Sequence, residues 1–256
     1  MILVLGGTED SREIATELTN QGYQVTISVV TEYGQELAIE TGASRVLSGP
    51  LDESKFTEII KQNSINTVVD ATHPFAAYIT GMAYKICNLL DIDYIRYERK
   101  TTNYLSHQLI KTAATFPLGL EIAASLPGPW LFTTGSKQLR EIIEAKVFSI
   151  DQLYLRVLPD PDVLANCFKL GLRARNIIAM QGPFSYELNR AMFQDLGIRT
   201  VITKDSGTVG GTLEKIKAGL ELELNVIIIA RPLIGLPKNI IVQTIPALIQ
   251  FLRRFK

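Results

Sequence analysis

The first residues with chemical potential follow an apolar run at the N-terminus. The segment ILVLGGTEDSRE places Gly6 and Gly7 directly after that run, and Thr8 and Ser11 at the start of a helical pattern. Glycines permit a tight turn and close backbone approach, and the N–H groups of a helix N-terminus attract phosphate oxygens. The spacing departs from G-x-G-x-x-G, because Thr8 and Ser11 replace the second and third glycines. The segment predicts a pyrophosphate site; a glycine turn with Thr8 or Asp10 as N-cap is the alternative.

The end of the second apolar run, VTISVVTEYG, indicates which nucleotide would bind. NAD-specific sites place a carboxylate there to hold the ribose 2′-hydroxyl, and a carboxylate would repel a 2′-phosphate. Ser28 and Thr31 stand at the expected tip, and Glu32 lies one step beyond. The pattern favours NADPH. No Tyr-x-x-x-Lys pair occurs in the sequence, which argues against a dehydrogenase that uses a tyrosine acid.

One of the two histidines of the chain, His73, follows an apolar run in the segment VVDATHPF. We expect the strand at 67–71 to lie next to the first strand, so that the loop Ala71, Thr72, His73 and Pro74 borders the nicotinamide of a bound dinucleotide. Pro74 suits the first turn of a helix. His73 is a candidate hydrogen-bond donor or acid, and the alternative is a histidine that caps a helix or bonds a neighbouring carbonyl.

Strand ends in the second half of the chain carry hydroxyl, glycine, amide or charged residues. These residues are Thr134, Ser136, Lys137, Gln181, Gly182, Ser185, Lys204, Asp205, Ser206, Gly207 and Arg231. Ammonium, guanidinium, hydroxyl and backbone N–H donors at one sheet edge suit a ligand with several carboxylates. For any one of them, a helix cap or a solvated charge is the alternative.

Short β-branched runs alternate with helical patterns, which predicts an α/β protein with parallel sheets. The expected strands are 2–5, 24–29, 45–47, 67–71, 94–98, 130–133, 152–157, 176–180, 200–203, 226–230 and 240–244. The expected helices are 9–20, 34–41, 52–63, 74–90, 137–145, 160–169, 185–195, 209–222 and 245–254. Periodicity weakens between residues 100 and 129, so we predict a nucleotide-binding domain over 1–99 and a second α/β domain with substrate-binding loops over 100–256.

Composition excludes several classes of protein. Twenty-six basic residues balance twenty-six acidic ones, which removes the electrostatic argument for a nucleic-acid or membrane-surface protein. The N-terminus lacks the pattern of a signal peptide, and no apolar run is long enough for a membrane span, so we expect a cytoplasmic protein. Cys87 and Cys167 sit in helical patterns without metal-ligand spacing, which predicts buried thiols and no metal site.

The sequence resembles the precorrin-6A reductases of cobalamin biosynthesis. The likeness covers nearly the whole chain and rests on VLGGTEDSRE, DATHPFAAYIT, GPWLFTTGSKQL, QGPFSYELN, TKDSGTVGGTLEKI and ARP, in that order. It implies two Rossmann-like, doubly wound parallel-sheet domains that face each other across a cleft. It also implies NADPH-dependent reduction of one carbon–carbon double bond in precorrin-6A or cobalt-precorrin-6A, a tetrapyrrole polycarboxylate, by a monomer or small homo-oligomer.

In that setting each loop has an expected role. Residues Gly6 to Ser11 hold the pyrophosphate, Ser28 and Thr31 lie near the 2′-phosphate, and His73 is the expected acid, with solvent or Asp205 as rivals. Lys137, Lys204 and Arg231 are expected on the carboxylate arms of the substrate. Two alternatives stay open: a two-domain tetrapyrrole synthase or lyase without nucleotide, against which the glycine turn argues, and a non-catalytic NAD(P)-binding sensor.

Overall fold

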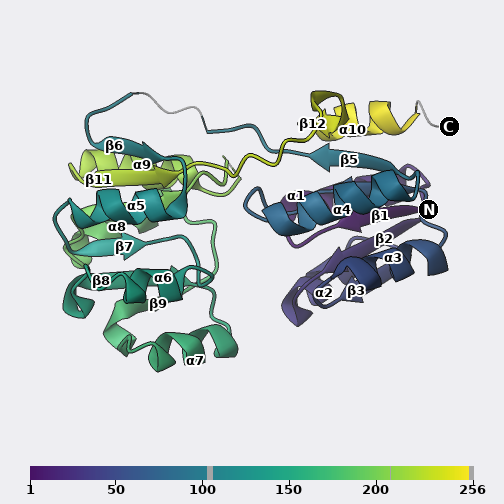
Figure 1. Ribbon diagram of the computed structural model, residues 1–256. Coiled ribbons are helices and arrows are strands. Elements are labelled where there is room, and N and C mark those ends of the chain that lie inside the picture. The colour runs from purple at the N-terminus through teal and green to yellow at the C-terminus, as the bar shows by residue number, and fades with distance from the viewer. Residues whose placement is uncertain (103–105, 208, 254–256) are drawn as a thin grey trace. The chain divides into compact units, whose positions relative to one another are not determined.

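The computed structural model describes residues 1–102, 106–207 and 209–253. The chain divides into unit 1, Met1–Arg99 with Leu233–Lys256, and unit 2, Lys100–Pro232. Each unit contains one six-stranded parallel sheet with helices between its strands, which confirms the predicted α/β class (Figure 1). No helix in the described part of the chain is long and apolar enough to cross a membrane.

The sheet of unit 1 has the strand order β3-β2-β1-β4-β5-β12. Its strands are β1 (Ile2–Leu5), β2 (Val25–Val29), β3 (Arg45–Ser48), β4 (Thr67–Asp70), β5 (Asp93–Tyr97) and β12 (Ile241–Val242). Its helices are α1 (Glu9–Asn20), α2 (Glu32–Ile39), α3 (Glu53–Gln62), α4 (Ala77–Leu89) and α10 (Ile245–Leu252). The strand order changes direction between β1 and β4, and β4 pairs with β1 as the sequence predicted.

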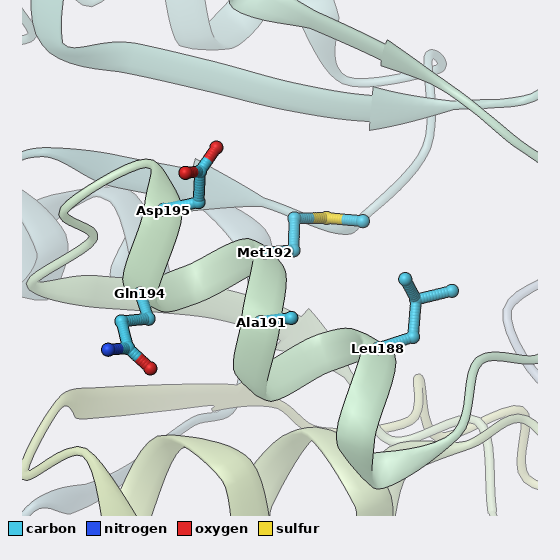
Figure 2. Close-up of a pocket in the computed structure, with 5 residues that line it drawn as sticks. All are labelled: Leu188, Ala191, Met192, Gln194 and Asp195. Atoms are coloured by element: carbon cyan, nitrogen blue, oxygen red, sulfur yellow. The ribbon is translucent and has the colours of Figure 1, made fainter.

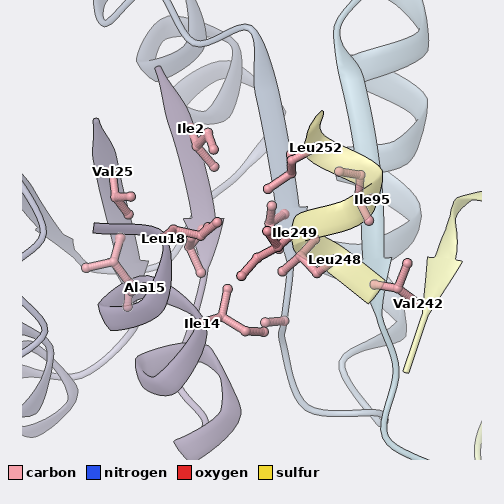
Figure 3. Packing of buried hydrophobic residues seen from close by; sticks show 14 of the residues in the cluster. Ile2, Ile14, Ala15, Leu18, Val25, Ile95, Val242, Leu248, Ile249 and Leu252 are labelled. Carbon is pink, nitrogen blue, oxygen red and sulfur yellow. The ribbon is translucent and has the colours of Figure 1, made fainter. Parts of the chain in front are cut away.

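Both faces of this sheet are buried, which is why its strands are nearly continuous apolar runs. Ile2 and Val4 of β1 point into one cluster, and Leu3 and Leu5 point into the other. Figure 3 shows the first cluster, in which Ile14 of α1 approaches Ile249 of α10. The C-terminal helix is therefore part of the core of unit 1.

Unit 2 has the strand order β9-β8-β7-β10-β11-β6. Its strands are β6 (Ile110–Ala113), β7 (Trp130–Phe132), β8 (Leu153–Val157), β9 (Ile177–Ala179), β10 (Thr200–Lys204) and β11 (Asn225–Ile229). Its helices are α5 (Phe116–Ala124), α6 (Leu139–Glu144), α7 (Pro161–Lys169), α8 (Tyr186–Asp195) and α9 (Thr212–Glu221). With β7 in the place of β1 and β10 in the place of β4, five strands follow the same order as in unit 1, and the sixth position is filled by β6, which precedes them in the chain, rather than by a strand that follows them as β12 does.

The last segment of the chain differs from the predicted second domain, 100–256. Residues 233–256 belong to unit 1, because β12 pairs with β5 through Ile241 with Arg96 and Val242 with Tyr97. Figure 1 shows the C-terminal elements β12 and α10, in yellow, beside the purple and blue elements of unit 1. The sixth strand of unit 1 thus comes from the end of the chain.

In the described part of the stretch from 100 to 129, for which the sequence analysis listed no strand or helix, the structure has β6 and α5. Strand β6 pairs with β11 at the edge of the unit 2 sheet. Helix α5 contains Gly119, where an added Cβ would lie 2.2 Å from Cδ1 of Ile229. A glycine that weakens the helical pattern is therefore required by close packing of α5 on β11. Elsewhere Cys87 and Cys167 are free and buried, as predicted.

Candidate cofactor and substrate sites

The turn after β1 is shaped by its two glycines. The Gly6 amide donates to the Ser28 carbonyl at 2.8 Å. A Cβ on Gly6 would lie 3.0 Å from that carbonyl oxygen and 3.2 Å from Oγ of Ser11. Gly7 has φ +100°, and no atom lies within 4 Å of the position of its missing Cβ. The turn is thus packed on the Gly6 side and open on the Gly7 side, where a ligand can approach the backbone.

Thr8 and Ser11 form a capping box at the start of α1. Oγ1 of Thr8 accepts a hydrogen bond from the Ser11 amide at 3.1 Å, and Oγ of Ser11 accepts one from the Thr8 amide at 3.1 Å. The Thr8 hydroxyl donates to the Ala71 carbonyl at 2.9 Å, which ties the turn to the loop after β4. The alternative prediction of Thr8 as an N-cap is therefore confirmed. The donors that α1 offers are its first backbone N–H groups, at Glu9 and Asp10, which have no intrahelical acceptor.

An arginine that the sequence analysis did not identify lies beside this helix end. The guanidinium of Arg99 forms an ion pair with Asp10, and both side chains are largely buried. Nη1 of Arg12 also donates to the Thr8 carbonyl, at 3.4 Å. Arg99 therefore balances the charge of Asp10, whereas Glu9, the other acidic residue in the first turn of α1, is exposed.

At the end of β2, Ser28 is buried while Thr31 is exposed at the tip. Thr31 caps α2, since its side chain accepts a hydrogen bond from the Gly34 amide at 3.0 Å. Glu32 is the first residue of α2 and is exposed.

The loop after β4 is a turn that His73 closes. The Phe75 amide donates to Nδ1 of His73 at 3.2 Å, and the Ala76 amide donates to the His73 carbonyl at 2.8 Å. Because Nδ1 accepts, the neutral imidazole carries its proton on Nε2. Helix α4 begins at Ala77, so the prediction of a helix from 74 with Pro74 in its first turn is wrong: the amides after Pro74 bond to His73 instead. No side chain caps α4.

Beneath this loop lies a buried polar network that the sequence analysis missed. Nη1 of Arg96 pairs with Oδ1 of Asp70 at 2.8 Å, and their side chains are 2% and 0% exposed. The Tyr94 hydroxyl donates to Oδ2 of Asp70 at 2.7 Å. The Thr72 amide and hydroxyl donate to Oδ1 of Asp70 at 3.0 and 2.7 Å, and Nη2 of Arg96 donates to the Thr72 carbonyl at 3.1 Å. Every bond of this network ends on β4, β5, α4 or the loop itself.

Burial and the charge of Asp70 raise the pKa of two groups beside this network and keep them protonated. Burial, followed by the charge of Asp70, raises the pKa of the Cys87 thiol to about 12. Burial and Asp70 likewise raise the pKa of the Tyr94 phenol. Tyr94 is therefore a permanent hydrogen-bond donor to the carboxylate. The signal in the sequence was an arginine inside the apolar strand DYIRY, which pairs in register with the aspartate that ends β4.

In unit 2, Lys204 joins the loops that follow β10 and β7. Its Nζ donates to the Thr134 carbonyl at 2.7 Å and to Oε1 of Gln138 at 2.8 Å. Burial, followed by the charge of Lys137, lowers the pKa of Lys204 to about 8. In the part of the chain that the structure describes, Oγ1 of Thr134 is buried and has no hydrogen-bond partner. Lys204 therefore donates hydrogen bonds to protein atoms. The sequence analysis predicted that it contacts a carboxylate arm of the substrate.

Asp205 and Arg231 hold the neighbouring loop. Nε of Arg231 donates to the Asp205 carbonyl at 3.1 Å, and Nη2 lies 3.9 Å from Oδ1 of Asp205. The same carboxylate oxygen accepts hydrogen bonds from the amides of Thr102 at 3.4 Å and Gly207 at 3.2 Å. Both side chains are buried. The Ser206 amide donates to Oγ1 of Thr212, which fixes the loop to the start of α9.

The remaining predicted residues are distributed over two loops. Lys137 is exposed before α6, and the Ser136 carbonyl accepts a hydrogen bond from the Leu139 amide at 3.1 Å. Gln181 and Gly182 are exposed after β9, and Ser185 is the N-cap of α8. Strand β9 lies at the sheet edge away from β10 and β11.

The loop after β9 nevertheless reaches the loop after β10. A Cβ on Gly211 would lie 3.5 Å from Cβ of Pro183. The structure therefore brings the predicted residues of β7 and β10 together through Lys204, and those of β10 and β11 through Arg231. It places the 181–185 segment against the start of α9.

A surface hollow elsewhere in unit 2 has none of these residues. Its volume is about 520 Å³, and Figure 2 shows its lining on α8: Leu188, Ala191, Met192, Gln194 and Asp195. In the described part of the chain, no group of three or more His, Cys, Asp or Glu side chains is placed to hold a metal ion.

Comparisons with known proteins agree over nearly the whole chain. The model of the family "Precorrin-6x reductase CbiJ/CobK" matches residues 1–253. The chain is 36% identical over 233 residues to "Cobalt-precorrin-6A reductase" of Priestia megaterium, covering 91% of each protein. It is 34% identical over 232 residues to the protein of that name from Salmonella typhimurium, covering 90% of this chain and 87% of the relative.

Among solved structures, the fold matches "CobK precorrin-6A reductase" with a TM-score of 0.78 and 22% identity, covering 99% of this chain and 96% of the other. The fold, the family model and the relatives all indicate the same family. The chain belongs to the CbiJ/CobK family of precorrin-6x reductases.

Proposed function

We propose that this oxidoreductase uses NADPH to reduce one carbon–carbon double bond of precorrin-6A or cobalt-precorrin-6A in cobalamin biosynthesis. The observation that carries the proposal is the open glycine turn of unit 1, joined through Thr8 and Ala71 to the loop after β4. These two loops flank the point where the strand order reverses, which is where open α/β sheets bind dinucleotides. The names of the relatives supply the substrate. Membership of a reductase family argues against a nucleotide-free synthase or lyase and against a sensor.

The residues of the turn fit a dinucleotide. Close packing around Gly6 and the left-handed φ of Gly7 leave the backbone accessible. The amides at the start of α1 are donors suited to a pyrophosphate. Ser28 and Thr31 are assigned to the 2′-phosphate, with Glu32 one residue beyond them, and the 71–74 loop is assigned to the nicotinamide. Bound NADPH supplies the hydride.

The contribution of the protein is chiefly to align the reactants and to place a proton donor. The turn after β4 fixes the ring of His73 through Nδ1, so its Nε2 edge is the one that carries a proton toward a ligand. Asp205 is a weaker candidate for the acid, because its carboxylate accepts two backbone hydrogen bonds and lies beside Arg231. We assign the proton delivery to His73 and a loop-holding role to Asp205.

The glycine turn provides the test. Gly7→Glu places a carboxylate at the proposed pyrophosphate site, and Gly22→Glu is the matched control. Gly22 lies in the same unit, also has a positive φ of +80°, and also has no atom within 4 Å of its missing Cβ. We expect Gly7→Glu to raise the Kd of NADPH, measured by nicotinamide fluorescence, by at least about tenfold, and Gly22→Glu to leave it near the wild-type value.

Turnover is measured in the same samples as the loss of nicotinamide absorbance after addition of precorrin-6A or cobalt-precorrin-6A. Oxidation of NADPH that requires the tetrapyrrole is the expected result. Equal NADPH affinities for the two variants would remove the assignment of the turn. A wild-type protein that oxidises no NADPH with either tetrapyrrole would overturn the proposed function.

A further inference from the structure

Two cationic side chains in unit 2 are buried without an ion pair in the described part of the chain. Arg156 on β8 and Lys215 on α9 are each 7% exposed. Among the described residues, neither forms an ion pair, although the buried Arg96 of unit 1 has Asp70 at 2.8 Å. Burying a cation without a counter-ion is costly, so the position of these two groups requires an explanation.

The guanidinium of Arg156 is held in one orientation. Its Nη1 donates to Oδ1 of Asn189 at 2.8 Å, and its carbon lies 4.2 Å from the centre of the Phe184 ring. Asn189 is fixed in turn, because its Nδ2 donates to the carbonyls of Phe184 at 3.2 Å and Ser185 at 2.7 Å. Within the described residues, Nε and Nη2 of Arg156 make no hydrogen bond. These two donors form one side of the guanidinium fork.

Lys215 reaches the same region from the helix that follows β10. Its Nζ has one long hydrogen bond, to the Gly210 carbonyl at 3.4 Å. The next residue, Gly211, lies against the loop that carries Phe184, since a Cβ there would be 3.7 Å from the Phe184 carbonyl oxygen. The two cations therefore lie under adjoining loops, those after β9 and β10. These loops contain Gln181, Gly182, Ser185, Ser206 and Gly207, which the sequence assigned to substrate.

Burial acts against the charged form of both groups, and the charge of Arg156 also acts against that of Lys215. Burial lowers the pKa of Arg156 to about 10. Burial, followed by the charge of Arg156, lowers the pKa of Lys215 to about 7, and only Glu214 acts in the opposite direction. Helix α8 contributes the uncharged Asn189. Glu214 acts on Lys215, and its Oε2 is itself buried without a hydrogen bond within the described chain.

We propose that Arg156 and Lys215 form a binding site for one carboxylate arm of the tetrapyrrole substrate. A planar carboxylate matches the fork of a guanidinium and accepts a further bond from an ammonium group. Of the three cations that the sequence suggested for this role, Lys204 and Arg231 donate to protein carbonyls, and Lys137 is exposed. The inference rests on the proposed function, because the substrate supplies the anion.

The test is Lys215→Met, with Lys217→Met as the matched control on an exposed position of the same helix. Binding of precorrin-6A is measured by equilibrium dialysis without NADPH, and stability by the Tm. We expect Lys215→Met to raise the Kd of precorrin-6A by about tenfold or more, while its Tm increases because a desolvated charge is lost. The Kd of NADPH is expected to stay unchanged, and Lys217→Met to resemble the wild type.

A purely structural lysine gives a different pattern: a lower Tm and an unchanged Kd for precorrin-6A, and that outcome would overturn the inference. Arg156→Lys is the second variant, because it keeps the charge and loses the fork; we expect an intermediate Kd. In the wild type, affinity for precorrin-6A should rise as pH falls from 8 to 6, since Lys215 gains its proton in this range, and Lys215→Met should lose that part of the dependence.

The experiments distinguish a failure of the proposed function from a failure of the carboxylate site. Because dialysis measures binding without turnover, a protein that binds precorrin-6A through these residues but does not oxidise NADPH would overturn the proposed function alone. A reductase whose affinity for precorrin-6A is the same in Lys215→Met and the wild type would overturn the carboxylate site alone.

Discussion

Units 1 and 2 share a spatial strand order but differ in the partners of their buried arginines. In unit 1, Arg96 on the fifth strand of the unit is neutralised by Asp70, and both oxygens of that carboxylate accept hydrogen bonds. In unit 2, Arg156 on β8 has an amide and an aromatic ring as its partners. A satisfied ion pair fixes a loop, whereas an unbalanced pair of cations leaves a positive region available for a ligand.

The two units also differ in the side chain that links the loops at the point where each sheet reverses its strand order. In unit 1 the Thr8 hydroxyl joins the loop after β1 to the carbonyl of Ala71. In unit 2 the ammonium of Lys204 joins the loop after β10 to the carbonyl of Thr134. One side-chain donor and one carbonyl close the same gap in both sheets, with a neutral donor in one unit and a charged donor in the other. The backbone amides of unit 1 therefore remain the principal donors at its turn.

The largest expected effect comes from removing one member of the satisfied pair. Arg96→Met leaves Asp70 as a buried carboxylate without its counter-ion, so we expect a loss of about 3–5 kcal/mol in the free energy of unfolding. Urea unfolding followed by circular dichroism measures it. Arg140→Gln, which breaks the exposed pair with Glu144, is the control and should cost only about 0.3–0.5 kcal/mol. Similar losses for the two variants would contradict the role assigned to burial.

The unbalanced cations give an effect of pH on stability. The pKa of Lys215 is about 7 in the folded protein and 10.5 in its unperturbed form. Between these values the unfolded chain holds the proton and the folded chain does not, so this group makes stability rise with pH, by at most about 1.4 kcal/mol per pH unit. Below pH 7 both states are protonated and the dependence on Lys215 ends.

The measurement is the difference in unfolding free energy between wild type and Lys215→Met at pH 7 and pH 9, because the other titrating groups cancel in that difference. The advantage of the methionine variant should shrink as pH rises. A difference that stays constant across this range would show that Lys215 keeps its usual pKa.

An effect smaller than that of Arg96→Met is expected where a hydrogen bond is lost and both charges of the pair remain. Tyr94→Phe removes the donor to Oδ2 of Asp70 and keeps the ring. We expect a cost of about 1.5–3 kcal/mol, the range for hydrogen bonds to charged groups. Tyr84→Phe is a suitable control. The Tyr84 ring contacts the Tyr94 ring edge-on, with 5.5 Å between the ring centres, and the substitution keeps the Tyr84 ring. Urea unfolding that gives equal values for both variants would remove Tyr94 from the network.

Local patterns in the sequence predicted most of the fold. Apolar runs identified the strands other than β6, and the glycines after β1 marked a turn whose φ of +100° at Gly7 requires glycine. The pairing of β12 with β5 was not predictable from such patterns, because the two strands are far apart in the sequence and β12 has two residues. The start of α4 was missed because the imidazole of His73 competes for the amide that follows Pro74.

The candidate sites were predictable as loops but not as individual contacts. The sequence placed Lys204, Asp205 and Arg231 at the ends of β10 and β11, where the structure also has them, and tertiary packing decided that they bond to protein carbonyls and amides. Arg96 and Arg156 had a common signal: each is the fourth residue of a strand, DYIRY or LYLRV, and stands two residues after a tyrosine. A charge inside an apolar strand indicates a buried group that needs a partner, but it does not say whether that partner is protein or ligand.

The return of the last strand to the first sheet determines how the molecule can be divided. A cut between residues 99 and 100 would release a fragment with the edge of β5 unpaired and without the apolar side chains of α10, an arrangement prone to aggregation. A fragment that joins 1–99 to 233–253 through a short artificial loop retains the full sheet. Any attempt to produce unit 1 by itself should therefore begin from this rejoined chain.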